Sequence, residues 1–129
     1  MHTLIVDDVF IIRKMLITML AEYGPCDVAE SGEEAIALFE SALKTLPYDL
    51  ICLDILMPRT DGLKVLENVR RIEKVNNIPS SRSVKIIMVT TLCDPDSVKT
   101  SVELGCDEYI AKPVKALKFR QKLKKLELI

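Results

Sequence analysis

The chain has 129 residues, of which 49% are hydrophobic and 29% charged, and its formal net charge at neutral pH is -1. This length and composition predict one soluble globular domain over residues 1–129, and the near-neutral charge argues against direct nucleic-acid binding, which depends on an excess of Lys and Arg. No apolar run approaches about 18 residues and the amino terminus has no basic region, so we expect neither a membrane span nor a signal peptide.

The first half of the chain alternates between apolar runs and segments of helical period. Leu4–Val6 predicts a buried strand, and the next segment predicts a helix that ends at Gly24-Pro25, with an inward stripe of Ile12, Met15 or Leu16, Met19 and Tyr23. Val28–Ala29 predicts a short second strand. A capping box at Ser31 and Glu34 then begins a helix with the apolar stripe Ala35, Leu38, Phe39 and Ala42.

The second half continues the same alternation. Leu50–Leu53 is apolar throughout, as expected for a third strand covered on both faces, and Asp61-Gly62 begins a helix through Leu63, Leu66 and Val69. After a polar connection, Asn76–Ser83, which we expect to be a mobile surface loop broken by Pro79, the predicted elements are a strand at Val84–Val89, a helix from Asp94-Pro95 to Gly105, a strand at Tyr109–Ile110 and a helix at Val114–Leu128. Five strand–helix units predict a parallel sheet with helices on both faces.

Polar residues follow these strands where ligands bind to an open parallel sheet, at the carboxyl edge. They are Asp7-Asp8, Asp54, Thr90, Tyr109 and Lys112-Pro113. Two carboxylates about 4 Å apart repel by roughly 4 kcal/mol at an effective dielectric near 20, so either the three aspartates change their ionisation or a cation neutralises them. Oxygen ligands without histidine or thiol favour Mg²⁺.

Each of these residues also has an ordinary structural interpretation. Asp7 and Asp8 are suited to capping a helix, Thr90 to ending a strand, and Tyr109 to a place in the core. Lys112 alone is also consistent, though less so, with a solvated lysine at a helix start. Asp54 is followed by a tight loop shaped by Pro58 and Gly62, which favours a nucleophile towards phosphorus over a simple cap.

The cysteines and the single histidine exclude other chemistry. Cys26, Cys52, Cys93 and Cys106 are widely spaced, and His2 is the only histidine, so a zinc site is not expected. Reduced thiols in a cytoplasmic protein are the simpler interpretation. We expect Cys52 to lie in the core and Cys93 to be accessible to alkylating reagents.

With these residues assembled, the chain resembles the receiver domain of two-component response regulators over essentially its whole length. The resemblance rests on Asp7-Asp8, on the block Asp54-x-x-Met57-Pro58-x-x-Asp61-Gly62, and on Lys112-Pro113 after Thr90. It implies a flavodoxin-like five-stranded sheet in the order 2-1-3-4-5. It also implies a chemotaxis-type single-domain regulator that signals, with only self-directed phosphotransfer and autodephosphorylation, and is not an enzyme.

The resemblance also assigns roles to individual residues. Asp54 is implied as the phosphoacceptor, with a sensor histidine kinase, a phosphotransfer protein or a small molecule as the donor. Asp8, Asp54 and the backbone carbonyl of Leu56 are implied as Mg²⁺ ligands, with Asp7 acting mainly through water. Thr90 and Lys112 are implied to contact the phosphoryl oxygens, and Tyr109 to turn inward when Thr90 moves.

This sequence has no output domain after Val114–Ile129, and if Ile129 is the natural end we expect the output to be the binding of a downstream protein. The sequence leaves open a homodimer through the face formed by the fourth helix, fifth strand and fifth helix. The last helix is cationic, which fits either a solvated face or docking to an acidic partner.

The alternative function is a receiver-like interaction module that works without phosphorylation. Leu56 and Leu92 flank the site, and we expect them to exclude attacking water and lengthen the lifetime of the phosphoaspartate.

Overall fold

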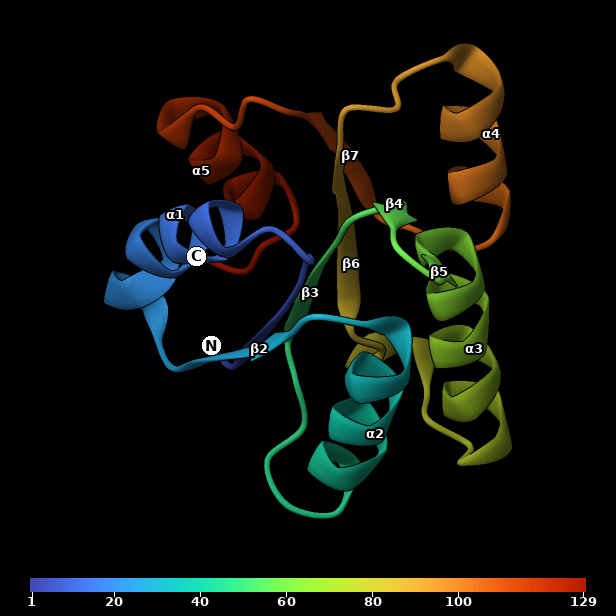
Figure 1. The fold of residues 1–129 in the computed structure, drawn as a ribbon. Helices are drawn as coiled ribbons and strands as arrows, with labels where there is room; N and C mark the ends of the chain where they lie inside the picture. The colour runs from blue at the N-terminus through green and yellow to red at the C-terminus, as the bar shows by residue number, and fades with distance from the viewer.

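Five parallel strands form a central sheet in the order β2-β1-β3-β6-β7 (Figure 1), in a computed structural model that describes residues 1–129. The strands of this sheet are β1 (Thr3–Val6), β2 (Cys26–Ala29), β3 (Leu50–Leu53), β6 (Lys85–Thr90) and β7 (Glu108–Ala111). The helices are α1 (Phe10–Leu20), α2 (Gly32–Leu43), α3 (Gly62–Val75), α4 (Pro95–Glu103) and α5 (Ala116–Lys125). Because β6 and β7 are the fourth and fifth strands of this sheet along the chain, the order is the predicted 2-1-3-4-5 of a flavodoxin-like fold.

The register of the strands brings the polar residues to one edge. Val6 of β1 is paired with both Ala29 of β2 and Leu53 of β3, so the aspartates that follow Val6 and Leu53 leave the sheet side by side. Thr90 at the end of β6 is paired with Ala111 at the end of β7, and Lys112 comes next. The parallel arrangement therefore gathers the candidate site residues at the carboxyl edge, as predicted.

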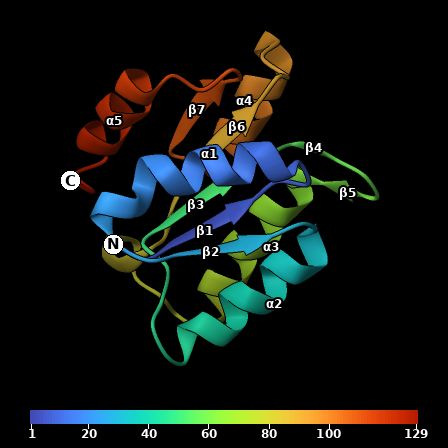
Figure 2. The same cartoon turned by 60° about the vertical axis from the view of Figure 1, so that its left-hand side comes forward.

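The helices cover the sheet on both faces, with α1 and α5 on one side and α2, α3 and α4 on the other (Figures 1 and 2). Alternate residues of a strand face opposite layers. In β1, Leu4 and Val6 pack in the layer of α2 and α3, whereas Ile5 packs in the layer of α1 and α5. Each fully buried side chain of this kind contributes about 1.5–3 kcal/mol of transfer free energy. None of the helices is both long enough and apolar enough to cross a membrane.

The predicted helix starts are confirmed at three caps. The side chains of Ser31, Asp61 and Asp94 accept hydrogen bonds from backbone N–H groups in the first turns of α2, α3 and α4. Of the two alternatives in the predicted inward stripe of α1, Leu16 is the residue that faces the core. Met15 is 37% exposed, whereas Leu16 is buried, as is Arg13 on the same helix.

The last helix is shorter than the predicted Val114–Leu128. It spans Ala116–Lys125 and is ended by Glu127, which has a φ of 59°. The N–H of Glu127 donates to the carbonyl of Lys124, and the N–H of Leu128 donates to that of Leu123. This pair of bonds is a Schellman motif, which ends a helix even where the apolar pattern continues.

The connection Asn76–Ser83 contains a turn of 3-10 helix, η2 (Ser80–Arg82), which the sequence did not predict. A second 3-10 turn, η1 (Ala21–Tyr23), follows α1. The connection after α3 is tied to the rest of the fold by Ser83, whose hydroxyl donates to Glu73 at 2.8 Å. This tether belongs to a larger polar network.

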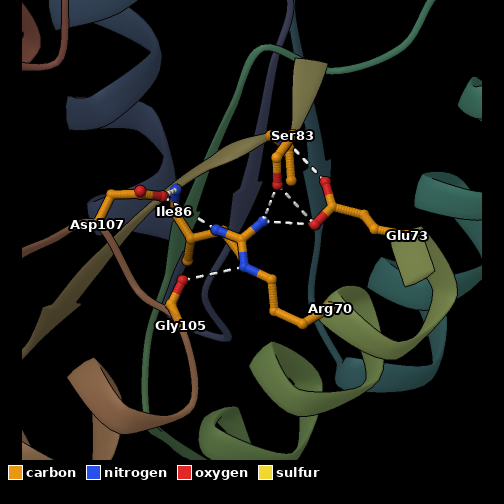
Figure 3. A network of polar contacts seen from close by, with 7 residues as sticks. Arg70, Glu73, Ser83, Ile86, Gly105 and Asp107 are labelled. Atoms are coloured by element: carbon orange, nitrogen blue, oxygen red, sulfur yellow. Dashed lines mark hydrogen bonds and ion pairs between the residues drawn. The ribbon is translucent and has the colours of Figure 1, made fainter. Parts of the chain in front are cut away.

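The network is centred on Arg70 of α3 (Figure 3). Its guanidinium donates to the Gly105 carbonyl at 3.0 Å, the Glu73 carboxylate at 2.6 Å, the Ser83 hydroxyl at 2.8 Å and the Asp107 carboxylate at 3.0 Å. One side chain thus ties α3 to the start of β6 and to the turn between α4 and β7. The network lies at the amino end of β6, away from the edge that carries the aspartates.

Candidate functional site

Three carboxylates meet at the carboxyl edge of the sheet. Asp7 and Asp8 follow β1, Asp54 follows β3, and one oxygen from each lies within 4.8 Å of the others. Asp7 and Asp54 are 1% and 4% exposed, and Asp8 lies nearer solvent. The structure therefore brings the three predicted acidic residues into one cluster.

Lys112, the residue after β7, contacts two of these three carboxylates. Its Nζ lies 2.7 Å from Oδ2 of Asp7 and 3.0 Å from Oδ2 of Asp54. Partial burial lowers the pKa of Lys112, but hydrogen bonds to the two carboxylates outweigh this and raise the pKa above its usual value. The side chain is therefore an ammonium at neutral pH. The Lys112-Pro113 peptide bond is cis.

The charges of the cluster do not balance. Three carboxylates face one ammonium, and unit charges at such separations interact by several kcal/mol even at an effective dielectric of 20. The donors are all oxygens, with no histidine or cysteine in the cluster. A hard divalent cation such as Mg²⁺, which takes one or two carboxylates together with phosphate oxygens, fits this donor set.

The loop after Asp54 is more regular than predicted. Leu56–Met57 (β4) and Thr60–Asp61 (β5) form a small antiparallel hairpin where the sequence suggested only a tight loop. The N–H of Leu56 donates to Oδ1 of Asp54 at 3.2 Å, which orients the carboxylate. Gly62 is required after the hairpin, because a Cβ there would collide with the carbonyl oxygen of Asp54.

The two predicted switch residues are both bound to Leu92, in the loop between β6 and α4. Thr90 is fully buried, and its hydroxyl accepts a hydrogen bond from the N–H of Leu92 at 3.2 Å. The hydroxyl of Tyr109 donates to the carbonyl of the same residue. Burial, followed by the nearby charges of Cys93, Asp94, Cys106 and Asp54, raises the pKa of Tyr109 to about 12, so this hydroxyl keeps its proton.

Leu56 and Leu92, the two apolar residues expected to flank the acidic cluster, lie together beside the loop that follows Asp54. Leu56 and Leu92 line a shallow cavity of about 560 Å³, together with Leu63 and Met57. The side chain of Leu56, two residues after Asp54, is 54% exposed.

Sequence reasoning missed two residues of the site. Leu92 was identified only as an apolar neighbour, although its backbone joins the two switch residues, a role that no side-chain pattern reveals. Arg13 was not identified at all. Its Nη1 donates to the backbone carbonyl of Asp7 at 2.9 Å, and a charged residue interrupting the apolar helix Phe10–Leu20 was the signal available.

Comparisons with known proteins agree with this geometry. Residues 3–124 match the family model described as the response regulator receiver domain. A probable transcriptional regulator, ycf27, of Cyanidium caldarium is 42% identical over 113 residues, which is 87% of this chain and 40% of that protein. The transcriptional regulatory protein ResD of Bacillus subtilis is 38% identical over 85% of this chain and 41% of its own length. The chain thus spans about two fifths of these relatives.

Solved structures match over nearly the whole chain. The response regulator TrrA from Thermotoga maritima, solved in complex with Mg²⁺ and BeF, is 36% identical with a TM-score of 0.76, covering 97% of both chains. A chain of the CheX–CheY–BeF3–Mg²⁺ complex from Borrelia burgdorferi is 27% identical with a TM-score of 0.85, covering 98% of this chain and 88% of that one.

Proposed function

The chain belongs to the response regulator receiver domain family, and on that premise we propose that it accepts a phosphoryl group on Asp54 in a Mg²⁺-dependent reaction. The observation that carries the proposal is the position of Lys112, whose ammonium bridges Asp7 and Asp54 inside a cluster of three carboxylates. A capping or purely structural arrangement does not require that concentration of charge.

Each residue of the cluster has a different role in phosphoryl transfer. An oxygen of Asp54 attacks phosphorus, and the bond from phosphorus to the donor breaks with its electron pair leaving on the donor. Lys112 stays within reach of Asp54 and stabilises the charge spread over the phosphoryl oxygens. Asp8, Asp54 and the backbone carbonyl of Leu56 would hold Mg²⁺, and Asp7 would act through water. Mg²⁺ supplies further neutralisation of that charge when bound.

The contacts of Leu92 suggest how phosphorylation is read out. When the Thr90 hydroxyl turns to the phosphoryl group, it leaves the N–H of Leu92, and the loop that also binds Tyr109 is released. A hydrogen bond to a charged group contributes about 1.5–3 kcal/mol. Moving an equilibrium from 1:99 to 99:1 needs about 5.5 kcal/mol, so two or three new contacts are of the right size, with little to spare.

The partners follow from the same chemistry. We propose a sensor histidine kinase or a phosphotransfer protein as the donor, and a downstream protein as the target, in the cytoplasm. Residues 1–129 act as one receiver unit in this proposal. The face formed by α4, β7 and α5 carries Tyr109, so it is where a target or a second copy would sense the switch.

A fluoroberyllate titration tests the proposal. Beryllium fluoride and Mg²⁺ together should raise the free energy of unfolding of the wild type, by about 2.7 kcal/mol when the ligand is at 100 times its dissociation constant. Beryllium fluoride alone should not do so, Mg²⁺ alone should add only the smaller stabilisation of its own binding, and Asp54→Asn should gain nothing from beryllium fluoride. Equal stabilisation of Asp54→Asn would overturn the assignment of Asp54. No response of the folded wild type would favour the interaction module that works without phosphorylation.

A further inference from the structure

Arg13 is a buried cation on α1 that the phosphotransfer chemistry does not use. Its side chain is 9% exposed, and burying a guanidinium is costly unless its donors find acceptors. Lys14, the next residue on the helix, is exposed to solvent. The contacts of Arg13 should therefore explain why its guanidinium is buried.

Those contacts hold the turn that carries the metal-binding aspartates. Nη1 of Arg13 donates to the backbone carbonyl of Asp7 at 2.9 Å, and Nη2 donates to Oε1 of Glu30 at 3.1 Å. The guanidinium also lies 5.8 Å from the centre of the Phe10 ring. Glu30 follows β2, so Arg13 ties the turn after β1 to the turn after the neighbouring strand.

Asp7 is fixed independently of Arg13, whereas Asp8 is not. The carboxylate of Asp7 accepts hydrogen bonds from the N–H of Val9 and from Lys112. The carboxylate of Asp8 has no donor in the structure, so its direction depends on the backbone between Asp7 and Asp8. A peptide unit is planar, so fixing the Asp7 carbonyl fixes the direction in which the chain enters Asp8.

We propose that Arg13 is a positioning residue for the divalent-cation site, which raises the affinity for Mg²⁺ by orienting the Asp7-Asp8 turn without touching the ion. The proposal rests on the proposed function, because it takes the acidic cluster to be the Mg²⁺ site. Residues that orient metal ligands from outside typically contribute a factor of 10–100 in metal affinity.

The direction of the change in Mg²⁺ affinity on replacing Arg13 distinguishes a positioning role from a purely electrostatic one. The positive charge of Arg13 repels a divalent cation, so loss of that charge alone would tighten Mg²⁺ binding. Loss of the hydrogen bond to the Asp7 carbonyl frees the turn and weakens binding. Arg13→Met removes both, and weaker binding would mean that orientation outweighs repulsion.

The experiment is isothermal titration of Mg²⁺ into the full chain, without any phosphodonor. Arg13→Met should raise the dissociation constant at least about tenfold. Lys14→Met, which removes one charge from an exposed place on the same helix, is the matched control and should change it less than about twofold. Glu30→Gln should also have little effect, because Glu30 is 67% exposed and the contact with Asp7 remains.

A second variant keeps the proposal testable if Arg13→Met is unfolded. Arg13→Lys keeps the charge but lacks the forked guanidinium that reaches both acceptors, so it should weaken Mg²⁺ binding at least about threefold. If Arg13→Met does not fold, this variant decides the question. Unchanged or tighter Mg²⁺ binding by folded Arg13→Met, or unchanged binding by Arg13→Lys, would overturn the role of Arg13. Absence of Mg²⁺ binding by the wild type would instead overturn the metal site itself.

A kinetic measurement gives an independent readout. The rate of phosphorylation by acetyl phosphate, followed as a function of Mg²⁺, should show a higher half-saturating Mg²⁺ concentration for Arg13→Met. The rate at saturating Mg²⁺ should stay within about threefold of wild type, because the acceptor and Lys112 are untouched. A lower saturating rate with unchanged half-saturation would contradict a positioning role.

Discussion

Replacement of Arg70 should destabilise the fold strongly, because its guanidinium neutralises a buried carboxylate. The side chain of Glu73 is 6% exposed, and in Arg70→Met it would keep only the Ser83 hydroxyl and the N–H of Val84 as donors. Asp107 would keep the N–H of Ile86. Removing one partner of a buried ion pair costs about 3–5 kcal/mol. Arg70 is itself 21% exposed, so we expect the lower end, about 3 kcal/mol.

Urea denaturation measures this loss. With a slope of about 1.5 kcal/mol per molar urea, the midpoint should fall by about 2 M. Lys99→Met is the control, because Lys99 lies 4.0 Å from Glu103 with both side chains largely exposed, and the change should stay below about 0.5 kcal/mol. Adding Glu73→Gln to Arg70→Met should restore part of the stability, because no uncompensated charge remains buried. A loss below about 0.5 kcal/mol in Arg70→Met, equal to the control, would refute this reasoning.

Three further predictions follow from the same structure. Iodoacetamide should label one thiol of the native protein, Cys93, and all four after unfolding, because burial raises the pKa of the other three, Cys26, Cys52 and Cys106. Labelling of a second native thiol at a similar rate would contradict this. The pKa values of all three tyrosines are raised by burial, that of Tyr109 to about 12, so absorbance at 295 nm should show less tyrosinate at pH 10 in the native protein than the roughly half ionisation expected in urea. Because the unfolded chain loses these protons first, the free energy of unfolding should fall as the pH rises from about 10 to 12; a flat profile would be inconsistent with the burial. Leu56→Asn should speed loss of the phosphoryl group about tenfold, since one hydrogen bond to an attacking water contributes about 1–1.5 kcal/mol, and an unchanged rate would exclude the shielding role of Leu56.

The strand order and the acidic cluster could be predicted because both depend on local patterns. Continuous apolar runs such as Leu50–Leu53 identify buried parallel strands, and a parallel sheet places whatever follows its strands at one edge. Asp7, Asp54 and Lys112 therefore meet although they are far apart in the sequence. The cap residues were equally readable, because Ser31, Asp61 and Asp94 each stand directly before a segment of helical period.

The remaining features depend on contacts that the residue pattern does not encode. The end of α5 is set by a left-handed backbone at Glu127, a residue type that rarely adopts it, so the apolar pattern extended the predicted helix too far. The inward position of Arg13 is stabilised by acceptors on other segments, the carbonyl of Asp7 and Glu30, which periodicity cannot show. The pairing of Thr90 with Leu92 is a backbone contact and left no signal in the sequence.

The central claim is that Asp54 accepts a phosphoryl group with the help of Mg²⁺. The most direct measurement is the intact mass of the protein after incubation with acetyl phosphate, with and without Mg²⁺, beside Asp54→Asn. We predict a gain of one phosphoryl group in the wild type that requires Mg²⁺ and is absent from the variant. A gain of the same size in Asp54→Asn, or a gain that does not depend on Mg²⁺, would contradict the account.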